Sequence, residues 1–295
     1  EDRDRGGREA TEQREERERG REEGGLEITL FGSSAAELFL KESDIDISVT
    51  CELSGSEVYS SLSPSLSRRC QSVTSVLNAR VPLISLQGFR SVTGREWDID
   101  IALSHFSDSH YGHSERIVQW TLCHIAKWEN IRVREVAVVV KLWAKRRDIN
   151  DAFSNTLPSL AYLVMVFSFA EKAAPTGVLI TSEFLLRFFF HFQRLLSGEK
   201  GERNDIIRTS DSLGDSSPLH RSRLVTACHD PGDTGRGRML FIQDPCLEEV
   251  NLGRFVDQFS LPRIVREFAR AVRILAAAGR HDRHAFCRLL KPRAC

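Results

Sequence analysis

Hydrophobic and polar residues alternate from Leu26 to Leu103, which is the pattern of half-buried β-strands. A short helix is expected over Ala35–Leu40, and the stretch SSLSPSLSRRC (60–70) is expected to form a loop or the start of a helix. This part of the chain therefore predicts a small mixed sheet. The expected strands are LEITLFG (26–32), DIDISVT (44–50), RVPLISLQGF (80–89) and EWDIDIAL (96–103).

From about Ser114 the hydrophobic spacing changes from every second residue to the three-to-four spacing of helices. Residues 198–237 are rich in Gly, Ser, Asp and Arg and are expected to form a loop or a disordered insertion. Residues 1–25 are almost wholly charged and have nothing to bury, which predicts a disordered tail. The expected helices are residues 114–129, 133–147, 156–173, 182–196 and 260–278.

These patterns predict an α+β fold in which the charged tail 1–25 is followed by a sheet domain, 26–130, and a mainly helical domain, 131–290. The sheet domain is expected to pack against the helical one. A cleft between two such domains is the expected place for a ligand.

The composition narrows the class of protein. Hydrophobic residues make up 41% of the 295, as in globular proteins, and 41 basic residues balance 41 acidic ones. This balance argues against a mainly electrostatic nucleic-acid binder, although local basic patches remain possible. The seven cysteines form no CxxC pair, which is typical of thiols in a reducing compartment. The apolar run AYLVMVFSFA (161–170) is about half the length of a membrane span, so no membrane is predicted as a partner.

The location follows from the same features. The tail is rich in Arg but also in Glu, unlike the acid-poor leader of mitochondrial proteins. The expected location is intracellular, and cytoplasmic rather than mitochondrial, with the nucleus left open.

The stretch FGSSAAELFLKESDIDISV (31–49) carries the first sign of chemistry. Asp44 and Asp46 share one strand face, because side chains alternate along a strand. Two neighbouring carboxylates repel each other, and a divalent cation is the usual way to hold them together. The Gly32–Ser33 turn before them can offer backbone N–H groups and a hydroxyl to phosphate oxygens.

A third carboxylate comes from the strand EWDIDIAL, where Asp98 and Asp100 share a face. Asp100 is preferred because it lies mid-strand between two isoleucines. Three carboxylates around one point suit two divalent ions, which clamp the attacking and leaving oxygens of a phosphoryl transfer. A single DxD pair would more simply be a solvent-facing strand edge. Two acidic strands together with a Gly-Ser turn favour a metal site.

Three blocks of the sequence resemble the terminal uridylyltransferases and non-canonical poly(A) polymerases of the DNA polymerase beta-type nucleotidyltransferase superfamily. They are FGS…SDIDI (31–47), VVVKLWAKRRDINDAFSNTLPSLAYLVMV (138–166), and FIQDPCLEEVNLGRFV (241–256) followed by EFARAVRIL (267–275). The resemblance implies a palm-like catalytic domain and a helical PAP-associated domain with the nucleotide between them. It also implies template-independent addition of nucleotides to RNA 3′ ends, with UTP favoured over ATP.

The same resemblance assigns roles to residues. Asp44, Asp46 and Asp100 are the implied ligands of Mg²⁺ or Mn²⁺ and the implied catalytic residues, while Gly32 and Ser33 contact the terminal phosphates of the nucleoside triphosphate. Further contacts to the nucleotide are implied for Ser114, Lys141, Lys145, Ser159 and Asp244.

The residues themselves support part of this assignment. Lys141 and Lys145 are four apart and share a helix face, where they can neutralise a triphosphate, or simply form a solvated helix edge. Trp143, off that face, is expected in the core. Arg68, Arg69, Arg132 and Arg134 are candidates for an RNA path by composition alone.

Three positions depart from the family pattern in the base pocket. Leu160 stands where the family has a stacking tyrosine, Leu247 where it has a glutamate, and Val250 where many uridylyltransferases have a uracil-selecting histidine. Tyr162 is too far along the helix to replace the missing tyrosine. These departures keep two alternatives open, a poly(A) polymerase that uses ATP and a catalytically weakened nucleotide- or RNA-binding subunit. A small-molecule nucleotidyltransferase is opposed by the second and third blocks. The sequence predicts no particular protein partner.

Overall fold

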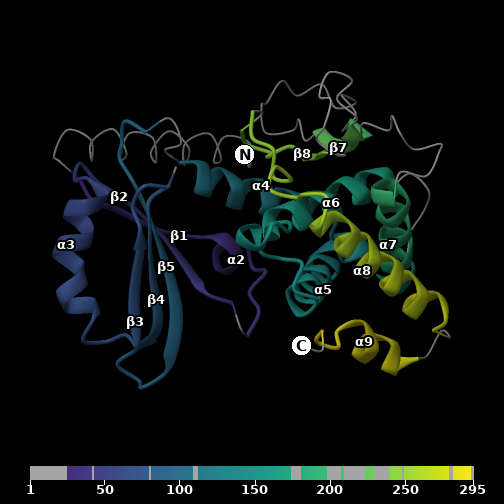
Figure 1. Ribbon diagram of the computed structural model, residues 1–295, viewed down its shortest axis with the longest axis horizontal. Coiled ribbons are helices and arrows are strands. Elements are labelled where there is room, and N and C mark those ends of the chain that lie inside the picture. The colour runs from purple at the N-terminus through teal and green to yellow at the C-terminus, as the bar shows by residue number, and fades with distance from the viewer. Residues whose placement is uncertain are drawn as a thin grey trace, which may run out of the picture. The chain divides into compact units, whose positions relative to one another are not determined.

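The computed structural model describes residues 25–41, 43–79, 81–108, 112–173, 181–197, 207–208, 223–228, 239–247, 249–278 and 282–293 (Figure 1). The chain divides into two compact units between Gln119 and Trp120, within helix α4 (His113–Lys127). The sequence pattern places this boundary later, after residue 130. The predicted charged tail lies outside the described residues, except for Gly25.

The first unit is built on a five-stranded sheet in the order β1-β2-β5-β4-β3. Strands β2 and β5 run parallel and the other neighbouring pairs run antiparallel, so the predicted mixed sheet of an α+β fold is confirmed. Strand β3 was not expected from the Ser- and Thr-rich stretch that forms it. The strands are β1 (Glu27–Phe31), β2 (Ile45–Thr50), β3 (Ser72–Val76), β4 (Leu83–Arg90) and β5 (Glu96–Ser104).

Helix α3 (Gly55–Leu66) contributes to the buried face of this sheet. It begins at a capping box in which the Ser54 side chain accepts from the backbone of Glu57 and the Glu57 side chain accepts from the backbone of Ser54. Val58 on this helix belongs to one buried cluster with Ile99 and Ile101 of β5. Because side chains alternate along a strand, burying these two isoleucines puts Asp98 and Asp100 on the opposite face.

The helix expected over Ala35–Leu40 is misplaced. The structure has a shorter helix, α2 (Gly32–Ala35), which starts directly after β1. It ends because Glu37 has a left-handed backbone, with φ of 56°. Leu38 and Leu40 are nevertheless buried, so their apolar character reflects core packing outside a helix.

Aromatic side chains fill the core of the second unit. Trp143 packs edge-on against Phe189 and Phe268, with ring centroids 4.7 and 5.0 Å apart. The helices are α5 (Val133–Arg146), α6 (Ser159–Ala173), α7 (Thr181–Ser197), α8 (Ser260–Ala276) and α9 (Arg283–Leu289), and the first four were expected. Across the described part of the chain, no helix is long and apolar enough to cross a membrane.

A second, three-stranded sheet includes two short strands from the predicted loop or disordered insertion at 198–237, most of which lies outside the described residues. Strands β6 (Ile207–Arg208) and β7 (Arg223–Cys228) fall within that range and pair with β8 (Met239–Ile242) in the order β6-β7-β8. The β6–β7 and β7–β8 pairings are both antiparallel.

Candidate active site

The centre of the candidate site is a pair of aspartates on neighbouring strands. Asp46 of β2 lies in register with Asp100 of β5, and because both strands run parallel the two side chains point to the same face. Both residues are half-buried. The sequence predicts that both acids belong to one site. Their pairing across the two strands brings them close enough for such a site.

Gly32 lies directly against this pair. Phe31 is the register partner of Asp46, so the next residue, Gly32, turns away beside the Asp46 carboxylate. Its φ is 64°, and a Cβ at this position would overlap the Asp46 carboxylate. Only glycine fits here, both because of its backbone conformation and because of the close approach.

The Asp100 carboxylate is oriented by a residue that the sequence analysis missed. Ser85 of β4 is the register partner of Asp100, and its hydroxyl donates a hydrogen bond to Asp100 Oδ1. Asp98 behaves differently, because its Oδ1 accepts from the backbone N–H of Gly88 at 2.8 Å and the residue is exposed. Asp98 thus holds the β4 irregularity next to it, and the preference for Asp100 as the third carboxylate agrees with this geometry.

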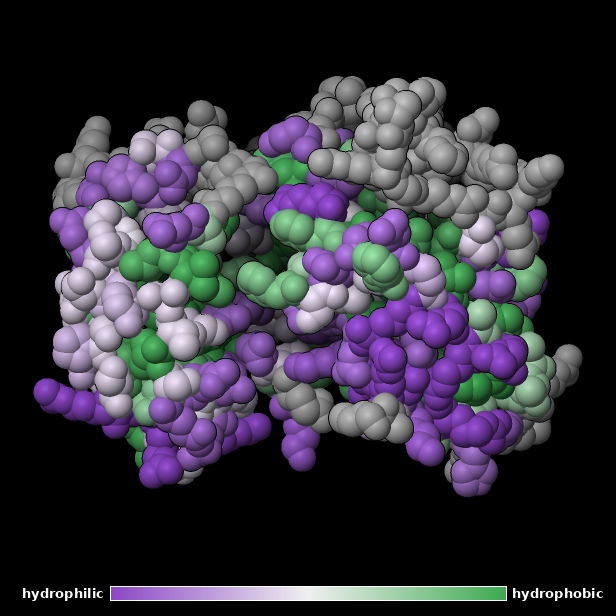
Figure 2. Space-filling view, viewed as in Figure 1, coloured by the Kyte–Doolittle hydropathy of each residue, from purple (hydrophilic) through white to green (hydrophobic). Residues whose placement is uncertain are grey.

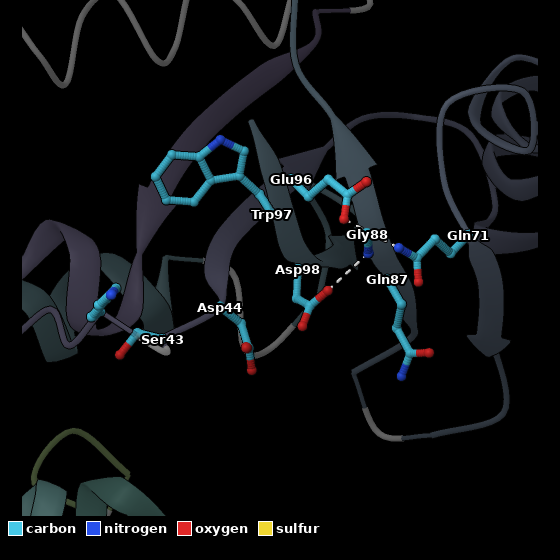
Figure 3. Close-up of a pocket in the computed structure, with 9 residues that line it drawn as sticks. Ser43, Asp44, Gln71, Gln87, Gly88, Glu96, Trp97 and Asp98 are labelled. Carbon is cyan, nitrogen blue, oxygen red and sulfur yellow. Dashed lines mark hydrogen bonds between the residues drawn. The ribbon is translucent and has the colours of Figure 1, made fainter. Parts of the chain in front are cut away.

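Asp44 lies one residue before β2 and lines a polar pocket of about 460 Å³ in the first unit (Figure 3). In the close-up, Asp44 and Asp98 are neighbours along the pocket, with Gln87 to their right and Trp97 above Asp44. No group of three or more His, Cys, Asp or Glu side chains within the described residues is arranged to hold a metal ion. Of the three expected carboxylates, Asp46 and Asp100 lie in register, whereas Asp44 lines the pocket with Asp98, and the three-carboxylate centre stays a prediction.

The residues fit a divalent cation by their chemistry. Asp46 and Asp100 supply hard carboxylate oxygens on one face, and Mg²⁺ is held in proteins by one or two carboxylates together with substrate phosphates. The Asp46 carboxylate fills the space that a Cβ at Gly32 would take, and a phosphate contact at the backbone of this turn stays a prediction. The cation itself stays a prediction.

The serines near this pair have different surroundings. Ser33 is half-buried in α2, and its carbonyl accepts from Leu38 N–H at 2.9 Å. The hydroxyl of Ser34 is buried and has no hydrogen-bond partner, which the residue pattern does not predict. Ser114 lies in the first turn of α4, next to Glu115, which accepts a 2.7 Å hydrogen bond from Thr29 of β1. Ser114 is therefore on the helix turn that contacts the edge strand.

The predicted nucleotide contacts at Lys141 and Lys145 lie in the second unit, on α5. Lys141 is buried, with 7% of its surface exposed, while Lys145 one turn later is exposed. The solvated edge considered from the sequence therefore describes Lys145 and not Lys141. Trp143 is fully buried, as expected of a core residue.

Ser159 forms a reciprocal hydrogen-bonded pair with Asn150. Asn150 Nδ2 donates to Ser159 Oγ at 2.9 Å, and Ser159 Oγ lies 3.2 Å from Asn150 Oδ1. Asn150 was not singled out from the sequence, although its position in the polar run DIND was visible.

Tyr162 is fully buried and donates to the Ile149 carbonyl at 2.6 Å, so it belongs to the core. Burial also raises the pKa of its hydroxyl well above the usual value. A buried Tyr162 does not replace the stacking tyrosine that the family has at position 160, in agreement with the prediction.

Asp244 is buried and holds the loop that follows β8. Its Oδ1 accepts from the backbone N–H groups of Cys246 and Leu247 at 2.8 and 3.0 Å. Val250 is also buried, and its carbonyl accepts from Asp244 N–H. Asp244 therefore shapes the loop that carries two of the three altered base-pocket positions, Leu247 and Val250.

The NLGR segment (251–254) holds the end of this loop through side-chain hydrogen bonds of Asn251. The residue pattern did not predict this role. Asn251 Oδ1 accepts from the N–H groups of Ile242 and Gly253 at 2.9 and 2.8 Å, and Asn251 Nδ2 donates to the Leu240 carbonyl. A Cβ on Gly253 would overlap that same carbonyl. The segment fixes the end of β8, which gives the loop before it a defined shape.

The match to a family of known proteins covers the glycine turn and one member of the aspartate pair, Asp46. Residues 12–78 match the nucleotidyltransferase domain family, a range that includes Gly32, Asp44 and Asp46. This chain carries a nucleotidyltransferase domain. The match begins within the charged segment and ends before β4, so it does not extend to Asp100.

Individual relatives of the domain include RNA-tailing proteins. Terminal uridylyltransferase 4 of Mus musculus is 29% identical over 167 residues, which are 53% of this chain and 9% of that protein. Poly(A) RNA polymerase protein 2 of Saccharomyces cerevisiae is 27% identical over 256 residues, which are 84% of this chain and 40% of that protein. The chain therefore spans less than half the length of either of these curated relatives.

The fold is similar to that of a solved poly(U) polymerase. The Cid1 poly(U) polymerase, crystallised with MgGTP, superposes with a TM-score of 0.65 over 91% of this chain and 87% of its own, at 20% identity. At this level of identity the likeness is one of fold. It extends through the helical unit as well as the sheet unit, which the domain match alone does not.

Proposed function

We propose that this chain is a template-independent RNA 3′-terminal nucleotidyltransferase that adds UMP from UTP or AMP from ATP. The observation that carries the proposal is the in-register pair Asp46–Asp100 with Gly32 against it. Supporting it, the relatives include a terminal uridylyltransferase and a poly(A) RNA polymerase, and Cid1 has been solved with its short product ApU.

In this proposal the RNA 3′ oxygen attacks the α-phosphorus of the triphosphate and pyrophosphate leaves. Asp100, oriented by the Ser85 hydroxyl, assists removal of the proton from the RNA 3′-hydroxyl. Asp46 and Asp44 complete the acidic site, and the backbone at Gly32 lets the phosphates approach. A divalent cation held by these carboxylates would supply charge neutralisation at the attacking and leaving oxygens. Positioning and charge neutralisation account for most of the rate.

The choice between UTP and ATP depends on the second unit. Val250 is apolar and buried, so it neither hydrogen-bonds a uracil carbonyl nor adds the bulk of a histidine against adenine. Use of ATP is therefore a second candidate activity, favoured by this one substitution. A weakened binding subunit is the remaining candidate, and the retained aspartate pair argues against it.

A primer-extension assay tests the proposal. The purified chain is incubated with a labelled single-stranded RNA, Mg²⁺ or Mn²⁺, and each nucleoside triphosphate separately. Extension with UTP or with ATP supports the proposal and assigns the nucleotide. A folded chain that binds a triphosphate but extends no RNA with any of the four contradicts it and leaves the binding subunit.

A further inference from the structure

We infer that the second unit carries a track for single-stranded RNA, formed by the exposed phenylalanines Phe153 and Phe259 and by the arginine face of α8. This inference rests on the proposed function for the identity of the ligand class. It assigns residues that neither the domain match nor the carboxylate site includes.

The two phenylalanines are unusually exposed for their size. Phe153 is 92% exposed and Phe259 is 78% exposed, and Phe255 nearby in the sequence is 48% exposed. Phe259 directly precedes α8, and its ring takes no part in capping, because the Asp257 side chain accepts from the N–H groups of Phe259 and Ser260. Local stability does not explain why either ring is so exposed, and this exposure indicates contact with a ligand.

Both rings sit on turns that are held rigid. The Asp151 side chain accepts from Phe153 N–H at 2.9 Å, and the Asp257 side chain accepts from Phe259 N–H at the same distance. The two turns are joined, since Asn155 Nδ2 donates to Asp257 Oδ2 at 3.1 Å. Residues far apart in the sequence thus present two aromatic rings from one fixed framework, which lowers the entropy cost of binding.

A row of arginines continues from Phe259 along α8. Arg263, Arg266, Arg270 and Arg273 follow at spacings of three and four residues, so all four lie on the face of Phe259. The opposite face is apolar and buried, with Ile264, Phe268 and Leu275. Over α8 the surface is strongly hydrophilic in Figure 2, where the helix lies as in Figure 1. The row spans roughly 15 Å at the rise of a helix, enough for several phosphates.

This row is not neutralised by carboxylates of its own helix. The only acidic residue of α8 is Glu267, and its carboxylate is taken by the buried guanidinium of Arg147. Arg263 and Arg270 donate to backbone carbonyls, of Asp148 and of Arg288 and Leu289, which fixes their positions. Arg266 and Arg273 are exposed. A cationic face of this kind fits a polyanion.

Single-stranded RNA is the partner that uses both features. Unpaired bases stack on aromatic rings, and their phosphates are neutralised by arginines along the same groove or face. An apolar protein partner would use the rings but not the arginines, and a duplex would use the arginines but not the rings. The combination favours an unpaired strand, as the substrate of a tailing enzyme requires.

The test measures RNA affinity separately from catalysis. A fluorescein-labelled single-stranded RNA and the duplex of the same sequence are titrated with the full chain, without nucleotide, at several salt concentrations. Phe153→Leu with Phe259→Leu keeps apolar area but removes the rings, and should weaken single-strand binding about tenfold or more without changing the salt slope. The tryptophan double variant should restore binding.

The arginines give an independent readout. Arg266→Ala with Arg273→Ala should lower the slope of log affinity against log salt by about 1.4, because each phosphate contact contributes about 0.7 for a single strand. The matched controls are Phe190→Leu, an exposed phenylalanine of α7 with Arg194 over its ring, and Arg187→Ala on the same helix. Neither control should change affinity or slope.

Several outcomes would overturn the track. They are unchanged single-strand affinity in the leucine variant, an unchanged slope in the arginine variant, or equal affinity for the duplex. Tolerance of leucine would mean that the rings dock an apolar protein surface instead. If wild-type chain binds RNA as described but extends none, the proposed function fails and the track stands. If the wild-type chain extends a trinucleotide primer while the variants bind RNA as tightly as wild type, the RNA track is refuted and the proposed function stands.

Discussion

Asp46 and Asp100 lie in register on two parallel strands, with Gly32 against Asp46 and Ser85 bonded to Asp100. This geometry puts two negative charges side by side in a half-buried position, which costs stability unless a cation or a substrate uses them. The pair is therefore the feature of the first unit that catalysis should need most.

Replacing either acid by its amide should remove nucleotide transfer. Asp46→Asn or Asp100→Asn should lower the initial rate of RNA extension on the order of 100-fold or more, the scale for losing a group that stabilises transition-state charge. Thermal unfolding should be unchanged or should shift upwards, because a repulsion is relieved. The matched control is Asp98→Asn, whose amide oxygen can still accept from Gly88 N–H. A loss in this control equal to that in Asp100→Asn would show that the third carboxylate is misassigned.

A methyl group at Gly32 should damage the same site sterically. Gly32→Ala places a Cβ on the Asp46 carboxylate and also pays about 1–2 kcal/mol for a left-handed backbone. We expect lower stability and loss of RNA extension. Gly94→Ala separates the two effects, since Gly94 has a φ of 78° with no atom near its missing Cβ. The control should lose stability, by urea unfolding, but keep its extension rate; full activity in Gly32→Ala would refute the close approach.

The base preference should respond to residue 250. Val250→His adds a hydrogen-bond donor and bulk in the loop shaped by Asp244, and should raise the ratio of UTP to ATP use. Val250→Phe is the matched control, because it adds bulk alone and should lower ATP use without a gain for UTP. Competition assays with both nucleotides measure the ratio. If neither variant changes it while both stay folded, the base is read by other residues.

The ion pair between Arg147 and Glu267 should be the most costly charge pair to break in the second unit. It is bidentate, at 2.8 and 3.0 Å, and both side chains are about nine-tenths buried, while Arg147 also donates to the Lys291 carbonyl. Glu267→Ala should lower the free energy of unfolding by about 3–5 kcal/mol, because it leaves a buried charge unpaired. The exposed pair of Arg187 and Glu183 is the comparison, and Glu183→Ala should cost about 0.5 kcal/mol or less. Equal losses in urea unfolding would contradict this.

The free energy of unfolding should fall in acid because Glu171 becomes protonated. Burial raises the pKa of this carboxyl, but hydrogen bonds and charges from His124 and Lys127 outweigh it, so the pKa is lowered overall. A lowered pKa gives stability that is present above the unfolded pKa, about 4.3, and is lost as the pH falls through the folded value. Glu171→Gln should flatten this acid limb in urea unfolding at pH 7 down to pH 3. An unchanged limb would assign the acid loss to other carboxylates.

Local pattern alone was sufficient for much of this protein. The alternation around Ile99 and Ile101 predicts β5 and puts Asp98 and Asp100 on one face, and the helical period predicts α5 with Trp143 inside. The turn at Gly32, the acids after it and the unsuitability of Tyr162 as a stacking residue also follow from residue type and spacing. These features depend on neighbours within a few residues, which is what a sequence displays directly.

Only the tertiary structure decided the features that join distant segments. Strand register pairs Asp46 with Asp100 and brings Ser85 to Asp100. The left-handed backbone of Glu37 ends α2 early, and core packing buries Leu38 and Leu40 outside a helix. The pairing of β7 with β8 and the hydrogen bond that joins the turns of Phe153 and Phe259 span longer separations still. A one-residue change of register would be invisible in composition yet would turn every side chain to the other face. Register is chosen by the whole core, so the sequence names the candidate acids, and the fold selects their partners.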